Sequence, residues 1–324
     1  MAIKLNPSKL VTIYGGSGFL GRYVTQELAR TGCRIRIAVR RPDLAGHLQP
    51  FGGVGQIHAV QANLRYPDSV SKAAEGADAA VNLVGILFET GKQKFSSVQA
   101  EGARNVARAA KAAGAEALVH VSAIGADPRS ASHYAQSKAA GETHVRKAFP
   151  DAVILRPSII FGPEDNFFNL FAGMARVSPV LPLIGGGRTR FQPVYAADVA
   201  KAVVASLEGG AKEGQIYELG GPEIVTFKEV LQRILRYTDR QRLLMPYPFW
   251  MARINAAFLQ LMPSPLLTVD QVRLLETDNV AQVKSRASAR SFEGLGIKPV
   301  SIDAVVPEYL GRFREHGEFA AIRR

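Results

Sequence analysis

The chain has 324 residues, of which 47% are hydrophobic and 21% charged, so it can form one large core or two unequal ones. Its formal net charge of +12 suits an anionic partner, such as a phosphate-bearing cofactor or a membrane surface. A single cysteine, Cys33, excludes an intramolecular disulfide and a CxxC metal site, and the six histidines show no HExxH spacing. We therefore expect no metal. No basic run is interleaved with aromatic residues, so we also expect no nucleic-acid partner.

Neither a signal peptide nor a membrane span is expected. Residues 1–6 are too short and too polar for a signal peptide before the first strand begins. No stretch reaches the roughly 18 uninterrupted apolar residues that a spanning helix needs. These features predict a soluble or peripheral protein.

Strand and helix patterns alternate through the first half of the chain. The segments with strand patterns are 10–14, 34–39, 56–60, 79–84, 117–122 and a sixth opening at 153–155. The segments with helical patterns are 19–30, 68–75, 95–113 and 134–149. This alternation predicts an α/β fold with a doubly wound parallel sheet of Rossmann type.

The amino-acid composition changes after Pro157, where prolines and glycines cluster at 162–163, 179–187, 193 and 220–222. We expect three parts. Residues 1–157 form a dinucleotide-binding domain, and 158–310 form a smaller, discontinuous α+β lobe interleaved with the sheet. The last part, 311–324, is a charged tail that is either mobile or a docking segment.

The glycine turn after the first strand is the strongest motif. Its sequence satisfies both GxxGxxG and GxGxxG from Gly15 to Gly21, and it follows a strand and opens a helix. Gly15 and Gly16 make the tight turn, Gly18 lets the backbone approach a pyrophosphate, and Gly21 permits close packing of the helix. The helix start then offers free N–H groups to the phosphates. The cofactor contacts expected here are Gly15, Gly16, Ser17, Gly18, Phe19, Leu20 and Arg22.

The end of the second strand indicates which dinucleotide is bound. An acidic residue there would bond the 2′-hydroxyl of NAD, whereas arginine accommodates the 2′-phosphate of NADP. This chain has Arg40 and Arg41, with no acid before Asp43, and Arg22 adds positive charge. The sequence therefore favours NADP(H) over NAD(H).

Tyr134 and Lys138 form the only Tyr-x-x-x-Lys pair in the chain. On a helix this spacing places both side chains on one face. A nearby ammonium favours the phenolate, so Lys138 should lower the pKa of Tyr134 toward that of a usable general acid and base. Lys138 can also bond the nicotinamide ribose.

Together, the glycine turn and this pair resemble the extended and atypical short-chain dehydrogenase/reductases, and the resemblance covers most of the chain. It implies that the third catalytic group is a hydroxyl near the end of the fifth strand. Ala123 stands at that position, and Ser122 lies one residue early. Because side chains alternate along a strand, the offset points Ser122 away from the site unless the strand ends there. The remaining cofactor contacts implied by the resemblance are Asn63, Leu64, Val84, Gly85, Pro157 and Ile160.

Within that family the sequence most resembles nucleotide-holding accessory subunits of respiratory complex I. The segments that carry this similarity are 82–85, 88–90, 98–103, 122–128, 134–142, 163–169 and 267–272. The resemblance implies a bound structural NADPH and other complex I subunits as partners in the hydrophilic arm near the membrane. It also implies a peripheral location on the cytoplasmic face of the inner membrane.

Residues 249–262 are almost entirely apolar but too short to span a bilayer. They fit either a buried helix of the second lobe or an interfacial helix that docks on a partner or membrane, with Trp250 near the headgroups and Arg240 and Arg242 nearby.

Two functions follow for the whole chain. The first is a non-catalytic, NADPH-holding subunit of complex I. The alternative is a free-standing NADP(H)-dependent reductase, dehydrogenase or epimerase that uses Tyr134 and Lys138.

Overall fold

The computed structural model describes residues 3–263, 265–282, 290–315 and 317. The chain divides into two compact units. The first unit comprises Met1–Pro157, Ala196–Leu219 and Gln282–Lys298. The second comprises Ser158–Tyr195, Gly220–Ala281 and Pro299–Arg324. The first break thus follows Pro157, and the chain returns twice to the first unit.

A parallel sheet forms the centre of the first unit. Among the described residues its strands are β1 (Leu10–Tyr14), β2 (Arg34–Val39), β3 (Ile57–Gln61), β4 (Ala79–Asn82), β5 (Ala117–Val121), β6 (Val153–Pro157) and β11 (Ile216–Leu219). Their order across the sheet is β11-β6-β5-β4-β1-β2-β3, with the strand order reversing between β1 and β4. Ligands bind outside the carboxyl ends of the strands at such a reversal. The expected doubly wound Rossmann fold is confirmed, and β11 adds a strand that the sequence did not reveal.

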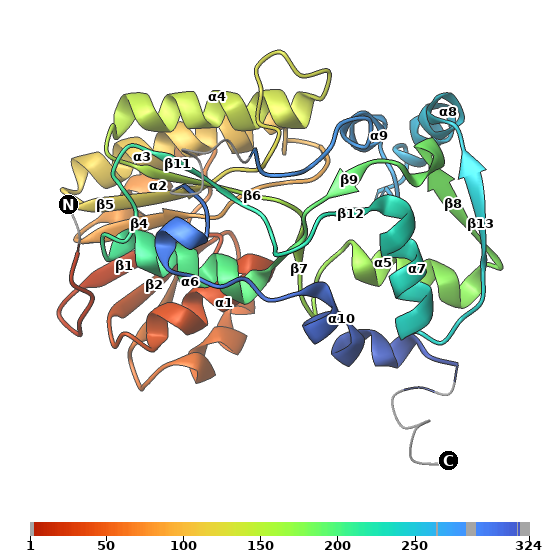
Figure 1. Cartoon of the computed structure of the whole chain (residues 1–324). Helices are drawn as coiled ribbons and strands as arrows, with labels where there is room; N and C mark the ends of the chain where they lie inside the picture. The colour runs from red at the N-terminus through yellow and green to blue at the C-terminus, as the bar shows by residue number, and fades with distance from the viewer. Residues whose placement is uncertain (1–2, 264, 283–289, 316, 318–324) are drawn as a thin grey trace. The chain divides into compact units, whose positions relative to one another are not determined.

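Helices cover both faces of this sheet (Figure 1). On one face lie α1 (Phe19–Ala29) and α6 (Ala196–Leu207), which contact each other. On the other lie α2 (Pro67–Ala74), α3 (Glu101–Ala112) and α4 (His133–Ala148). Buried alanines of α3 let α4 pack closely against it. The helix expected over 95–113 is divided, because a π-helical turn, η3 (Ser96–Ala100), precedes α3.

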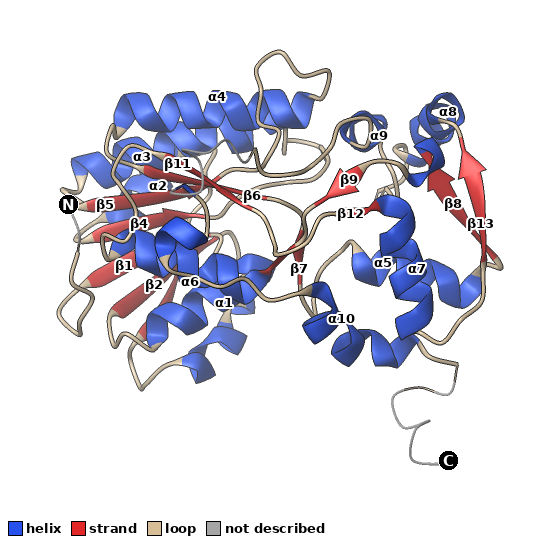
Figure 2. Ribbon diagram, in the orientation of Figure 1, coloured by secondary structure: helices blue, strands red, loops and turns tan. Residues whose placement is uncertain are grey.

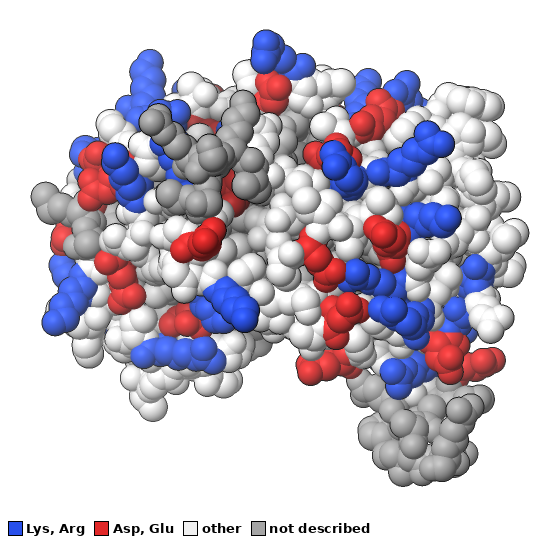
Figure 3. Space-filling view, in the orientation of Figure 1, with Lys and Arg blue, Asp and Glu red and all other residues white. Residues whose placement is uncertain are grey.

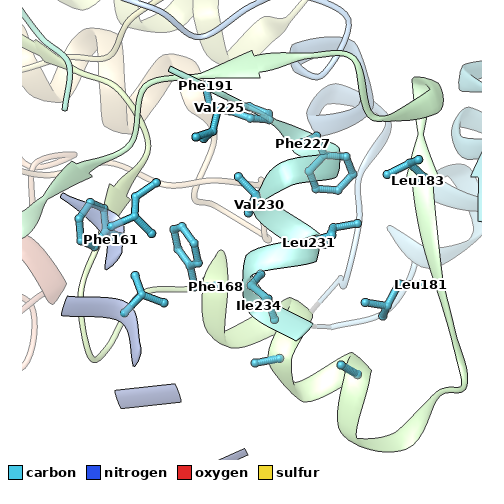
Figure 4. Close-up of a cluster of buried hydrophobic side chains, with 14 of the residues drawn as sticks. Phe161, Phe168, Leu181, Leu183, Phe191, Val225, Phe227, Val230, Leu231 and Ile234 are labelled. Atoms are coloured by element: carbon cyan, nitrogen blue, oxygen red, sulfur yellow. The ribbon is translucent and has the colours of Figure 1, made fainter. Parts of the chain in front are cut away.

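The second unit combines short strand pairs with helices, as expected for an α+β lobe (Figure 2). Its strand pairs are β7 (Ile160–Phe161) with β10 (Val194–Tyr195), β8 (Val180–Ile184) with β13 (Leu243–Tyr247), and β9 (Arg190–Phe191) with β12 (Val225–Thr226). Its α-helices within the described residues are α5 (Phe168–Val177), α7 (Phe227–Tyr237), α8 (Phe249–Leu259), α9 (Val269–Leu274) and α10 (Ile302–Leu310). A separate hydrophobic core surrounds Phe161, Phe168 and Phe227 (Figure 4).

The segment expected to be a charged tail begins as part of the second unit. Gly311 is buried, and Phe313 packs against the core of that unit. Arg312 Nη2 donates to Asn169 Oδ1 at 2.6 Å, and Arg314 Nε donates to the Tyr237 carbonyl at 3.2 Å. The expectation of a tail starting at residue 311 is therefore wrong for residues 311–315. Residues 316 and 318–324 of this segment lie outside the described residues.

Of the two alternatives for 249–262, the structure contradicts the buried helix. Only Ala252 and Ala256 of α8 are fully buried, and they lie on one face of the helix. The opposite face carries Trp250, Ile254 and Phe258, which are 62%, 51% and 70% exposed. In the space-filling view the uncharged surface at the upper right, in the region of α8, is bordered by Lys or Arg side chains (Figure 3). In the part of the chain that the structure describes, no helix is long and apolar enough to cross a membrane.

Candidate functional site

The glycine turn joins β1 to α1 in a geometry that larger residues would disturb. Gly15 has a φ of +84°, and its N–H donates to the Ala38 carbonyl of β2 at 3.1 Å. A Cβ on Gly21 would lie 2.4 Å from the carbonyl oxygens of both Gly15 and Gly16. Gly18 is the exposed N-cap of α1 and supplies no side-chain cap to the first turn of the helix. The turn therefore leaves backbone N–H groups of the helix start open to an anionic ligand. Three further expected contacts, Ser17, Phe19 and Leu20, lie half-buried in the same turn.

The loop after β4 connects this turn to α4. A Cβ on Gly15 would lie 3.1 Å from Val84 Cγ2, and one on Gly85 would lie 3.3 Å from Lys138 Nζ. Asn82 Oδ1 orders the loop by accepting the Val84 N–H at 3.1 Å. The structure thus brings together residues from three distant segments at the carboxyl ends of β1, β4 and β5. Their close spacing, which a Cβ at either glycine would fill, fits an extended ligand such as a dinucleotide.

Tyr134 and Lys138 lie one helical turn apart on α4. Lys138 Nζ is 5.9 Å from the centre of the Tyr134 ring and donates to the Val121 carbonyl at 3.3 Å. Burial lowers the pKa of Lys138 to about 8, an effect that Glu142 partly opposes. Burial also raises the pKa of Tyr134 to about 12. The expectation that Lys138 lowers the pKa of Tyr134 is therefore wrong, because the loss of solvent on burial raises that pKa instead.

An ion-pair network anchors α4 to the sheet. The Arg156 guanidinium of β6 donates to both carboxylate oxygens of the buried Glu142 of α4, at 2.8 and 2.6 Å. Glu218 of β11 lies 3.5 Å from the same guanidinium. These contacts set the position of the helix that carries Tyr134 and Lys138. The sequence could not predict these ion pairs of Arg156, because the partners come from segments that only the fold brings together.

Ser122 follows directly after the end of β5 at Val121. Its N–H still donates to the Leu155 carbonyl of β6 at 2.7 Å, so the strand alternation continues through it. Ser122 therefore faces the same side of the sheet as His120, toward α4, and the expectation that the offset points it away from the side of Tyr134 and Lys138 is wrong. Its Oγ is buried and has no hydrogen-bond partner among the described residues. Ala123, at the position where the family resemblance implies a hydroxyl, is half-buried.

The arginines expected near a 2′-phosphate differ in their surroundings. Arg41 is occupied, because its guanidinium binds the Asp43 carboxylate at 2.7 Å. Arg40 lies exposed at the carboxyl end of β2, and Arg22 is half-buried in the first turn of α1. Arg40 is thus better placed than Arg41 to meet a phosphate in solution.

The remaining expected contacts fall in different surroundings. Asn63 Oδ1 accepts the Arg65 N–H at 3.2 Å, forming a turn after β3. Leu64 is buried in the core of the first unit. Pro157 ends β6 and accepts the Ile124 N–H at 3.0 Å. Ile160 belongs to β7 of the second unit.

A buried pair at the ends of β4 and β5 was not identified from the sequence. Asn82 and His120 are opposite each other in the parallel register, and Asn82 Nδ2 lies 3.1 Å from His120 Nδ1. Burial lowers the pKa of His120 to about 3, so its ring stays neutral. The signal was available, since Asn82 ends β4 and His120 is the last residue but one of β5, both at the carboxyl edge of the sheet. Across the described ranges, no cluster of three or more His, Cys, Asp or Glu side chains could hold a metal ion.

Similarity to proteins of known family extends over most of the chain. Residues 11–220 match the model of the NAD dependent epimerase/dehydratase family. The chain is 33% identical to the mitochondrial NADH dehydrogenase [ubiquinone] 1 alpha subcomplex subunit 9 of Arabidopsis thaliana, over 95% of this chain and 79% of that protein. The corresponding mouse (Mus musculus) protein is 34% identical over 95% of this chain and 81% of its own length. A ceramide reductase of Caulobacter vibrioides is 38% identical over 60% of each chain.

Solved structures share the fold at lower identity. An NADPH-dependent quinone oxidoreductase of Escherichia coli, complexed with NADPH, superposes with a TM-score of 0.70 at 21% identity, over 93% of this chain and 99% of that one. A dTDP-glucose 4,6-dehydratase of Streptomyces venezuelae, with NAD bound, gives a TM-score of 0.70 at 19% identity, over 94% and 96% of the two chains. The sequence match and the shared fold agree, and the chain belongs to the NAD dependent epimerase/dehydratase family.

Proposed function

We propose that this chain is an accessory subunit of respiratory complex I that holds NADPH as a bound, stabilising cofactor. The observation that carries the proposal is the similarity to complex I subunits of plant and animal mitochondria, which extends over 95% of this chain. Similarity confined to a nucleotide-binding core would not single out complex I, whereas this similarity includes the second unit. The partners are then other subunits of the hydrophilic arm close to the membrane.

The cofactor is NADPH rather than NADH in this proposal. The glycine turn holds the pyrophosphate at the start of α1, and Arg40 with Arg22 meets the 2′-phosphate. Lys138 lies where it can bond the nicotinamide ribose. When bound, NADPH supplies a hydride, but here its main contribution is to stabilise the native state by binding only to it.

Two features of the first unit support a role without turnover. Ala123 supplies no hydroxyl where the family resemblance implies one, and the neighbouring Ser122 hydroxyl, on the α4 side, is buried. Burial raises the pKa of Tyr134 to about 12, which disfavours the phenolate needed for reversible proton exchange near neutral pH. Both features reduce catalytic competence without affecting the glycine turn.

Attachment to the membrane surface fits the exposed face of α8. Trp250, Ile254 and Phe258 form an outward apolar stripe, and Leu261 beyond the helix is 80% exposed. The sequence from 240 to 269 contains three arginines and no acidic residue. Arg253 is paired with Glu276, and the charges of Arg240 and Arg242 suit anionic headgroups. We therefore propose a peripheral position on the cytoplasmic face of the inner membrane, with α8 at the lipid interface.

Native mass spectrometry of the particle that contains this chain tests the proposal. We expect the chain to co-purify with NADH:quinone reductase activity and to carry one NADPH that survives gel filtration. Trp250→Ser with Phe258→Ser should weaken membrane attachment without releasing the nucleotide. Recovery of the chain alone and without nucleotide would contradict the proposal.

A second candidate is a free-standing NADP(H)-dependent reductase, favoured by the retained Tyr134 and Lys138 pair. The ceramide reductase among the relatives makes a lipid carbonyl the first substrate class to assay. The test measures NADPH oxidation with a panel of carbonyl compounds, including long-chain ketones. Turnover that Tyr134→Phe abolishes would favour this function over the structural one, and absence of turnover with the whole panel would count against it.

A further inference from the structure

Three polar side chains are buried together between β5 and α4, on the face of the sheet away from α1. His120 is 2% exposed, Ser122 is 4% exposed, and Lys138 is 5% exposed. His120 and Ser122 are two residues apart on the same face, so their Cα atoms are about 7 Å apart. Lys138 Nζ bonds the carbonyl of Val121, the residue between them, and its charge also acts on the His120 ring.

The hydrogen bonds of Asn82 determine which nitrogen of His120 carries the proton. Asn82 Oδ1 accepts the Val84 N–H, which fixes the orientation of the amide group. The amide nitrogen then faces His120 Nδ1 at 3.1 Å and can only donate, so Nδ1 must accept. The proton of the neutral ring therefore lies on Nε2.

The groups that face α4 have unmet hydrogen-bonding capacity. Within the described part of the chain, neither His120 Nε2 nor Ser122 Oγ has a hydrogen-bond partner, and both atoms are buried. The great majority of buried polar groups in proteins have a hydrogen-bond partner. A buried water is retained where two to four such groups surround it. The three side chains supply N–H, O–H and ammonium donors together with a hydroxyl acceptor, so that one water can accept from two of the donors and donate to the hydroxyl oxygen.

We propose that His120, Ser122 and Lys138 form a binding site for one buried water, and that His120 is a positioning residue that holds this water against the Lys138 ammonium. The water oxygen accepts hydrogen bonds from His120 Nε2–H and from Lys138 Nζ, and one water hydrogen is donated to Ser122 Oγ. The low pKa of His120 supports this arrangement, because the ring keeps a neutral donor over the physiological range. The water in turn keeps Lys138 at the end of β5, beside Gly85. The position of Lys138 affects cofactor affinity, and only this consequence rests on the proposed function.

Histidine NMR tests the site directly. In protein labelled with 15N-histidine, assigned by comparison with His120→Gln, we expect His120 to remain the neutral Nε2–H tautomer from pH 5.5 to 8. The Nε2 proton should exchange slowly and show a cross-peak to a long-lived water. A Nδ1–H tautomer, titration near pH 6.5, or an assigned Nε2–H signal without contact to water would overturn the proposal.

A double-mutant cycle tests whether one water links the side chains. His120→Gln keeps a donor near the Nε2 position, whereas His120→Phe removes it. The cycle compares equilibrium constants for unfolding. The combined effect of His120→Phe and Ser122→Ala should be about fivefold smaller than the product of their separate effects, because both substitutions remove the same water. The matched control is Thr25→Val on α1, which removes another buried hydroxyl without a partner among the described residues. In this control cycle the combined effect of Thr25→Val and Ser122→Ala should equal the product of their separate effects. The same coupling in both cycles would overturn the proposal. If His120→Phe does not fold, the same cycle is measured with His120→Gln, for which we expect a smaller coupling.

Cofactor affinity tests the positioning role. His120→Phe should weaken NADPH binding about tenfold, and His120→Gln should recover most of that loss. Equal affinities for His120→Phe and the unaltered chain would overturn the positioning role. An unaltered chain that binds no NADPH would instead contradict the proposed function, while the NMR and mutant-cycle results would still decide the water site.

Discussion

Gly18→Ala should abolish dinucleotide binding while leaving the fold intact. The backbone at Gly18 has φ −75° and ψ 178°, which alanine adopts freely. An added Cβ would lie 3.3 Å from the Gly15 carbonyl oxygen, a tight contact that a small shift relieves. The same methyl group would stand on the exposed side of the turn, where the pyrophosphate has to approach the backbone. The substitution therefore separates binding from folding.

The size of the effect follows from the linkage of binding and folding. NADPH at 100 times its Kd should stabilise the unaltered chain by about 2.7 kcal/mol. For a unit of this size, that corresponds to a rise of roughly 5–10 °C in Tm. In Gly18→Ala this rise should disappear, and the Tm without nucleotide should change by no more than about 2 °C, because the weaker N-cap preference of alanine is offset by the lower entropy of the unfolded chain. Differential scanning fluorimetry with and without NADPH measures both quantities.

Two other glycines provide matched controls. A Cβ on Gly46 would meet nothing within 4 Å, so Gly46→Ala should keep both the Tm and the NADPH-dependent rise. A Cβ on Gly21 would lie 2.4 Å from two carbonyl oxygens, and Gly21→Ala should lower the Tm without nucleotide. Its overpacking costs about 1–3 kcal/mol, with the crowding here at the upper end, against a gain of about 1 kcal/mol in helix propensity. A full NADPH-dependent rise in Gly18→Ala would refute the assignment of the turn as the pyrophosphate site.

Three further predictions follow from the same structure. Arg40→Ala should weaken NADPH binding at least tenfold without affecting NADH, and Arg41→Ala should have a smaller effect, both measured by titration calorimetry; equal losses for the two nucleotides would argue against 2′-phosphate recognition. Burial lowers the pKa of Lys138 to about 8 from 10.5, so the folded chain binds this proton less tightly than the unfolded chain does. Lys138→Met should therefore stabilise the nucleotide-free protein at pH 7 by up to about 3 kcal/mol, with the gain shrinking between pH 8 and 10.5 in denaturant titrations; a gain that does not depend on pH would contradict this reasoning. Phe168→Ala, at a fully buried position, should destabilise the second unit by about 3–5 kcal/mol in the same assay, whereas Phe258→Ala, at a site 70% exposed, should change its stability by less than about 0.5 kcal/mol.

The features that the sequence alone determined are those that depend on neighbouring residues. The Rossmann sheet followed from strand and helix periods, and the turn at Gly15–Gly21 followed from the absence of Cβ atoms at set intervals. The four-residue spacing of Tyr134 and Lys138 placed both on one face of a helix. Because the carboxyl ends of parallel strands share one edge of a sheet, the sequence also indicated where these motifs would meet.

Only the tertiary structure decided what surrounds each of these groups. Lys138 was expected to lower the pKa of Tyr134, but burial raises that pKa, because desolvation depends on every element packed around the pair. The apolar residues of α8 fitted a buried helix or an exposed one equally well, and packing on Ala252 and Ala256 alone left Trp250 and its neighbours at the surface. Composition cannot distinguish such cases, since the face that a helix buries is chosen by the elements that reach it. The pairing of Asn82 with His120 likewise required the register of two strands that are 38 residues apart in the chain.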